Sequence, residues 1–249
     1  MAVKSVLSEA QNGQAYANLA RAFHLPSDKV EEAVNDMLDA LVPDIAERML
    51  SRRSLAGLVE LLGKSDYEKV LETPTLLGAT HTQVLGSEAL NVLAGRKESK
   101  RLVRHAAATA GVSEMISEYL LPSLAAILVG ALARTCRPEL EAIMGHSHDP
   151  AARRDLAPQP QLPRVSGGVG FSGSTGGSQS VATYGAPESQ YIDLAEEIRR
   201  PTSSAADTAD AVRRVLAPVL GLPPEPSNWL RRIGSWSMSA LTALTGQRR

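Results

Sequence analysis

Apolar residues recur three and four positions apart along most of residues 1–145, which is the spacing of one face of an α-helix. The first apolar stripe covers residues 16–23, and a longer one runs over residues 30–50 across Pro43. Ser27 stands ahead of the longer stripe and is a good N-cap residue. Because proline is tolerated in the first turn of a helix but kinks its interior, Pro43 either kinks one long helix or starts another.

Shorter helices follow, and glycine residues stand at most of their ends. The pattern predicts these helices over residues 54–62, 67–71, 87–93 and 98–109. Gly63 is expected to end the first of them and Gly111 the last. The third is bounded by Gly86 and Gly95. Residues 73–82 are expected to form a loop or a turn.

A long run without charged residues predicts a helix at the centre of the fold. Ser113 is expected to cap this helix, and residues 120–133 within it carry no charge. Because a helix needs about 20 residues to cross a membrane, the run indicates a buried core helix instead. We expect Leu124 and Leu128 on its inner face. Residues 137–144 are expected to form a separate short helix or turn.

A weak internal repeat links the two proline-containing helices. Residues 41–46 read Leu-Val-Pro-Asp-Ile-Ala, and residues 120–125 read Leu-Leu-Pro-Ser-Leu-Ala. Each copy follows a turn with a capping serine. Two copies are too few for a solenoid, so the repeat favours a pseudo-symmetric compact bundle.

The composition agrees with helix-on-helix packing. Hydrophobic residues make up 43% of the chain, which is enough for a core, but aromatic residues only 4%. The core therefore consists mostly of aliphatic side chains, which suit packed helices better than a β-sandwich. We predict an all-α fold with a compact multihelical domain.

The chain has one cysteine, Cys136, so it has no intramolecular disulfide. This favours a reducing compartment, and the first residues show no signal-peptide pattern. We expect a cytoplasmic protein, with the periphery of the inner membrane as the alternative location. Cys136 itself is expected to be a small packed hydrophobic residue.

A change of composition divides the chain into three parts. Residues 147–187 are rich in proline, glycine and serine and have little to bury, which predicts a flexible, disordered linker. The helical domain is then residues 1–146, and a helical tail covers residues 188–249. Within the tail, helical spacing predicts segments near residues 191–198 and 212–220.

The last part of the tail predicts an amphipathic helix over residues 228–245. Its apolar face contains both tryptophans of the protein and consists of Trp229, Leu230, Ile233, Trp236, Leu241 and Leu244. Its other face contains Arg231, Arg232, Ser239 and Thr242. Residues 213–249 hold six arginines and one acidic residue, whereas the whole chain has a net charge of −1. We select this helix as the candidate interaction surface.

Two classes of partner suit this helix. An exposed stripe of tryptophan and aliphatic residues is costly in water unless something covers it. The helix either docks on the rest of the chain or on a partner protein, or it lies on an anionic membrane surface. Tryptophan beside arginine fits anionic lipid headgroups, so the membrane stays an open alternative.

A second, weaker candidate is a basic face formed by Lys97, Lys100, Arg101 and Arg104, which recur at helical spacing. Such a row has the charge to bind the phosphates of nucleic acid or another anion. The domain that carries it is net acidic, however, whereas domains that bind nucleic acid are usually strongly basic. DNA binding is therefore less favoured than an ordinary solvated helix face.

No pattern in the chain indicates a reaction. The sequence has no Gly-x-Ser-x-Gly motif, and its glycine-rich stretch lacks the Gly-Lys-Ser/Thr of a phosphate-binding loop. Residues 146–149 read His-Ser-His-Asp but border the expected linker, with no cysteine cluster nearby. We expect no catalytic residues, no cofactor and no metal site.

The segment from Gly86 to Gly95 is followed by residues 110–113, by Leu120-Leu121-Pro122 and by Gly130. The order of these elements resembles the YidB-like family of bacterial proteins. It covers roughly residues 10–135, although Ala94 stands where family members usually have a bulky aromatic residue. It implies a multihelical fold in a bacterial cytoplasm and no reaction, because the family is one of unknown function.

These observations favour a non-enzymatic interaction or scaffold protein with an unidentified protein partner or a self-docking tail. A peripheral membrane protein tethered by its C-terminal helix is the alternative, and DNA binding is the third hypothesis.

Overall fold

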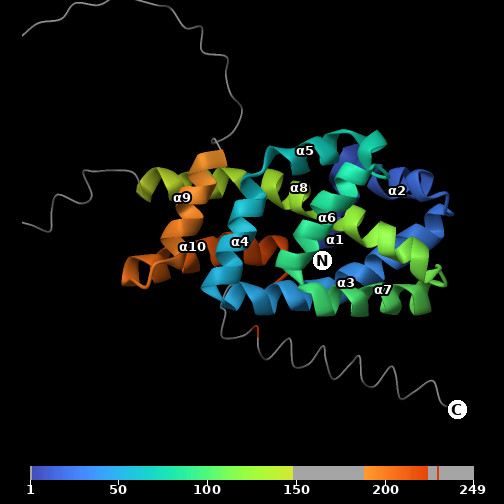
Figure 1. The fold of residues 1–249 in the computed structure, drawn as a ribbon. Helices are drawn as coiled ribbons and strands as arrows, with labels where there is room; N and C mark the ends of the chain where they lie inside the picture. Colours follow the sequence, from blue (N-terminus) through green and yellow to red (C-terminus); the bar gives the residue numbers. More distant parts are fainter. Residues whose placement is uncertain (1, 148–187, 224–228, 230–249) are drawn as a thin grey trace, which may run out of the picture.

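The protein is an assembly of α-helices, and the computed structural model describes residues 2–147, 188–223 and 229 (Figure 1). No β-strand occurs within these residues, which confirms the predicted all-α fold. In chain order the elements are α1 (Ala2–Gly13), α2 (Ala15–Phe23), α3 (Ser27–Leu50), α4 (Arg52–Gly63), α5 (Ser65–Glu72), the 3-10 helix η1 (Pro74–Leu76), α6 (Thr80–Leu93), α7 (Arg96–Ala110), α8 (Glu114–Ser147), α9 (Glu188–Arg199) and α10 (Ser203–Val219). The predicted linker, apart from Ser147, lies outside the described residues.

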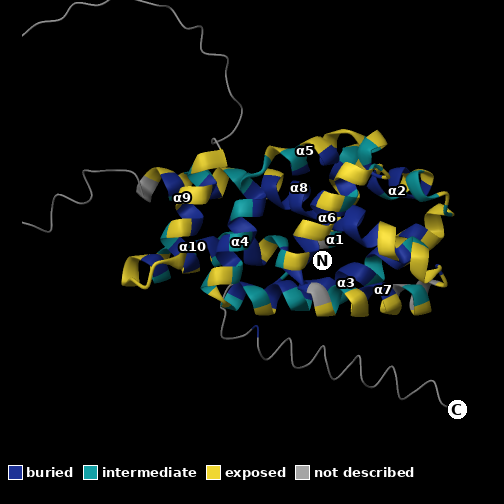
Figure 2. Cartoon of the chain, viewed as in Figure 1, coloured by how far each residue is buried: buried dark blue, intermediate teal, exposed yellow. Residues whose placement is uncertain are grey.

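The central element is α8, which contacts α1, α5, α6, α7 and α10 and passes through the middle of the fold (Figure 1). All residues from 120 to 133 are buried, and the side chains of Leu124 and Leu128 are fully enclosed. Figure 2 shows the buried residues on the inner faces of the surrounding helices. The stretch Glu114–Gly145 has the length and composition to cross a membrane, but 78% of its most apolar window is buried in the fold. The predicted core helix is confirmed.

Both long helices continue through their prolines. Helix α3 passes Pro43 without interruption, and α8 passes Pro138. Pro43 therefore starts no new helix, and the prediction of a separate helix over residues 137–144 is wrong. Each interior proline removes one backbone hydrogen bond, but the helix keeps its buried stripe on both sides of it. In α8 that stripe continues with Cys136 and Leu140, which are both buried.

The helix ends agree only partly with the predicted caps. The Ser113 hydroxyl accepts a hydrogen bond from the Ile116 amide at 3.3 Å, as predicted for the start of α8. Ser27, however, is the first residue of α3 and makes no capping hydrogen bond, because Pro26 occupies the N-cap position. Helix α4 begins at Arg52, two residues before the predicted start of this helix at residue 54. The loop predicted over residues 73–82 contains η1 and the start of α6.

Gly86 does not bound a helix but lies inside α6, where this helix crosses α8. A methyl group at residue 86 would overlap the backbone carbonyl of Pro122. Gly130 of α8 has a similar role where α8 meets α5, because the carbonyl oxygen of Tyr67 takes the space that a side chain at residue 130 would need. Glycine at these two positions therefore sets how closely α5 and α6 approach the central helix.

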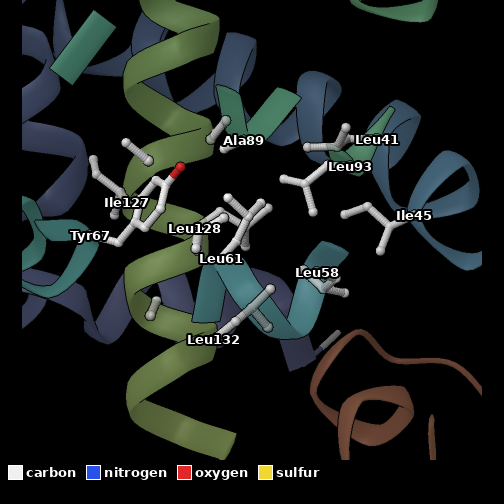
Figure 3. Close-up of a cluster of buried hydrophobic side chains, with 14 of the residues drawn as sticks. Leu41, Ile45, Leu58, Leu61, Tyr67, Ala89, Leu93, Ile127, Leu128 and Leu132 are labelled. Atoms are coloured by element: carbon white, nitrogen blue, oxygen red, sulfur yellow. The ribbon is translucent and has the colours of Figure 1, made fainter. Parts of the chain in front are cut away.

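One aromatic side chain lies among the aliphatic residues around α8 (Figure 3). The ring of Tyr67 is fully buried, and its hydroxyl donates a hydrogen bond to the carbonyl oxygen of Leu85 at 3.0 Å. Burial raises the pKa of this phenol well above its ordinary value. Tyr67 therefore fills the core as a neutral side chain whose polar atom is satisfied.

Candidate interaction site

The candidate interaction surface begins at a residue that is itself part of the core. Trp229 is fully buried and belongs to the main hydrophobic cluster. Its indole N–H donates a hydrogen bond to the carbonyl oxygen of Pro223 at 2.6 Å. The other members of the surface lie outside the described residues: Leu230, Arg231, Arg232, Ile233, Trp236, Leu241 and Leu244. Trp229 therefore anchors the segment that follows it and is not open to a partner.

Two helices that follow the predicted linker bring the chain to Trp229. Helix α9 packs against α4, and α10 packs against α8 and α9 (Figure 1). Tyr191 and Ile198 of α9 and Val212 and Leu216 of α10 are buried in the same cluster as the N-terminal helices. The described part of the tail is thus packed on the domain and shares its core.

Glycine shapes the contact between α9 and α4. A methyl group at Gly63 would overlap the side chain of Tyr191, so the absence of a side chain at this helix end lets Tyr191 sit directly on it. The sequence pattern predicts that a helix ends at Gly63, and α4 does end there. Its second role depends on a residue more than 120 positions away in the chain.

Ionic contacts hold the tail helices on the domain at several points. The Arg199 guanidinium pairs with Glu60 of α4 at 2.6 Å, and Arg52 donates to the carbonyl oxygen of Arg200 at 3.1 Å. Arg213 of α10 donates from Nε to the carbonyl oxygen of Met49 at 2.8 Å. From Nη2 it donates to the next carbonyl oxygen in the chain at 3.1 Å. These are the last carbonyls of α3, which no residue of the helix itself bonds.

Substitution of Arg213 by methionine is expected to lower the free energy of unfolding by about 1–3 kcal/mol. The change keeps an aliphatic stem but removes two charge-assisted hydrogen bonds from a side chain that is only 11% exposed. Urea unfolding followed by circular dichroism measures the effect. The matched control is Arg214→Met, since Arg214 is exposed and donates to the backbone carbonyl oxygen of Asp210 in its own helix, and its effect should stay within about 0.5 kcal/mol. Equal losses in both variants would show that Arg213 does not cap α3.

The second predicted face lies on α7, which packs along α3. Lys97, Lys100, Arg101 and Arg104 are all exposed, so the structure does place them on one solvent-facing helix. Arg101 is nevertheless engaged within the fold: it pairs with Asp44 of α3 at 3.3 Å and with Glu98 at 2.7 Å. At least one member of the basic row therefore neutralises the acidic side of α3.

Two aspartates of α3 that sequence analysis did not select face this contact. Burial raises the pKa of Asp44 to about 6, and the nearby Arg101 opposes that shift only partly. Burial also raises the pKa of Asp36, with His105 as the largest opposing influence. Both aspartates are partly buried and stand two helical turns apart on α3, and this spacing is the signal that the sequence contains.

Cys136 fits the prediction of a packed hydrophobic residue. Its side chain is buried, and burial raises the pKa of its thiol to about 12. A thiol in that state is a weak nucleophile near neutral pH. No group of three or more histidine, cysteine or acidic residues within the described parts of the chain has the arrangement of a metal site.

Comparison with known proteins gives one match. The family described as "Bacterial protein of unknown function (DUF937)" matches residues 5–135. Searches of curated proteins and of solved structures returned no match. The matched residues run from α1 into α8. The surface of α4 that contacts α9 therefore lies within the family region, whereas α9, α10 and Trp229 lie beyond it.

Proposed function

Because the chain belongs to the DUF937 family of bacterial proteins of unknown function, to which the YidB-like proteins belong, we propose that it is a non-enzymatic interaction or scaffold module. In this proposal, residues 230–249 bind a partner protein in the cytoplasm. The observation that supports it is the burial of Trp229, which fixes the start of this segment to the folded domain.

The anchoring of the segment makes it suited to recognition. Residues 188–223 and Trp229 pack on the domain, and twenty residues follow Trp229 in the sequence. These residues contain four arginines and no acidic residue, together with Ile233, Trp236, Leu241 and Leu244 at helical spacing. An amphipathic helix of this kind fits an apolar groove with acidic groups at its rim.

Tryptophan fluorescence tests the proposal, provided that each tryptophan is observed alone. The Trp229→Phe chain keeps an aromatic ring in the core and leaves Trp236 as the single reporter. If residues 230–249 require a partner protein, Trp236 should emit like a solvated tryptophan and be quenched readily by acrylamide. Vesicles that contain anionic lipid should not change this emission. The matched Trp236→Phe chain reports Trp229, which should emit at shorter wavelength and resist quenching in both conditions.

Two outcomes would contradict the proposal in different ways. A blue shift of Trp236 that appears only with anionic vesicles, and weakens as salt screens the arginines, would indicate a membrane tether. Protection of Trp236 without vesicles would indicate that the segment docks on its own domain.

The membrane tether remains the second candidate function, because both tryptophans and four arginines occur within residues 229–249. Burial of Trp229 favours the protein partner, since it leaves one tryptophan for a lipid surface. Nucleic-acid binding through α7 is less favoured, since Arg101 pairs with two carboxylates.

A further inference from the structure

The contact between α3 and α7 buries more carboxylate groups than its cations neutralise. Asp44 has a side chain that is 13% exposed, and Arg101, the guanidinium that it pairs with among the described residues, also pairs with Glu98. Two turns earlier on α3, the Oδ2 atom of Asp36 is buried and has no hydrogen-bond partner within the described structure. One cation shared by two carboxylates, together with an unsatisfied carboxylate oxygen two turns away in the same contact, is an unfavourable arrangement for fully ionised acids.

Charged groups on the neighbouring helices influence both aspartates. Asp44 is influenced by Arg101 and Glu98 of α7 and by Glu47 of its own helix. Asp36 is influenced by groups on three helices: His105 of α7, Lys4 of α1, and Glu32 and Asp39 of α3. Each aspartate therefore has acidic neighbours as well as a cation, and neither set of cations cancels the cost of burial.

We propose that the α3–α7 contact is a proton-sensitive joint, which holds α7 firmly in mildly acidic solution and more loosely at neutral pH. In acid, Asp36 and Asp44 take up protons and their burial costs less. At neutral pH both become carboxylates, and the contact gains negative charge.

The direction of the effect follows from the raised pKa of the two aspartates. An acid whose pKa is higher in the folded state binds protons more tightly there than in the open state. The stabilisation of the joint is therefore complete below the ordinary aspartate range and is lost as pH rises through about 6. Opening of α7 would expose Leu102 and Val103, which are buried at present.

Hydrogen exchange on the full chain tests the joint. Amide protection in α7, corrected for the intrinsic pH dependence of exchange, should fall about fourfold between pH 5.5 and pH 7.5, which is the change that one acid with a folded-state pKa of about 6 produces over this range. Amides of α9 provide an internal reference, and their corrected protection should not change. Asp44→Asn should raise protection of α7 at pH 7.5 and remove most of the difference between the two pH values.

Matched variants keep the test decisive. Asp28→Asn makes the same substitution at an exposed site in the first turn of α3 and should retain the full pH dependence. If Asp44→Asn does not fold, Asp36→Asn tests the same contact. It should also reduce the difference in α7 protection between the two pH values. Arg101→Gln should lower protection of α7 at pH 7.5 further. An α7 that responds to pH no more than α9, or an Asp44→Asn chain with the same pH response as the unaltered chain, would overturn the proposal.

Discussion

Gly86→Ala is expected to lower the free energy of unfolding by about 3 kcal/mol, as measured by urea denaturation. The added methyl group would overlap the backbone of α8 at Pro122, and a backbone cannot move aside as a flexible side chain does. The higher helix propensity of alanine, worth about 1 kcal/mol, offsets only part of this cost. The helices α6 and α8 would have to separate, which loosens the core on one whole side of α8.

Gly57→Ala is the matched control for this prediction. Gly57 also lies inside a helix, but a methyl group there would meet only the Cγ1 atom of Val92 at 3.5 Å, an ordinary contact distance. The substitution should therefore be neutral or stabilise the protein by up to about 1 kcal/mol. If Gly86→Ala were as harmless as Gly57→Ala, the close approach of α6 and α8 would be refuted.

Leu128→Ala is expected to destabilise the protein by about 2–5 kcal/mol, the usual range for a leucine removed from a core. Leu128 lies on the central helix, and Figure 3 shows it among Leu61, Ile127 and Leu132. The surrounding helices are held at their distances by the glycine contacts, so the cavity cannot close completely. Thermal or urea unfolding measures the loss.

An exposed residue on a neighbouring helix supplies the control. The side chain of Val84 in α6 is 64% exposed, so Val84→Ala should change stability by no more than about 0.5 kcal/mol. A loss below about 1 kcal/mol for Leu128→Ala would mean that this face of α8 is not the core.

Periodicity was sufficient to predict the main helices but not the role of the glycines. The stripes on α3 and α8 and the buried run through Leu124 and Leu128 follow directly from apolar spacing. The pattern predicts a helix boundary at Gly86, because glycine often ends a helix. Residue 86 has no room for a side chain because Pro122, 36 positions later in the chain, approaches it closely. Such a contact has no local signal in the sequence.

Local rules for caps and prolines were also outweighed by packing. Ser27 has the side chain of a cap, but Pro26 takes that position because its fixed backbone suits the residue before a helix. Residues 2–13 received no prediction, yet they form α1 and bury Leu7. The tertiary contacts of such a short segment decide its structure more than its own propensity does.

The sequence predicts the amphipathic character of the candidate site but not how Trp229 packs on the domain. The two tryptophans and the arginines identified the C-terminal segment as amphipathic, but the burial of Trp229 depends on the packing of α9 and α10. The capping of α3 by Arg213 joins residues more than 160 positions apart. A sequence pattern of period three to four carries no information about such pairs.

The most direct measurement of the proposed function is protein capture with faces of the C-terminal helix altered one at a time. The unaltered chain is compared with an Ile233→Glu, Leu244→Glu chain and with a Ser239→Glu, Thr242→Glu chain, using extract from a bacterial cytoplasm and quantitative mass spectrometry. Both variants add the same charge, but the first changes the apolar face and the second the polar face. The proposal predicts a specific protein that the unaltered chain and the polar-face variant retain, and that the apolar-face variant loses. Equal retention by all three chains would contradict it.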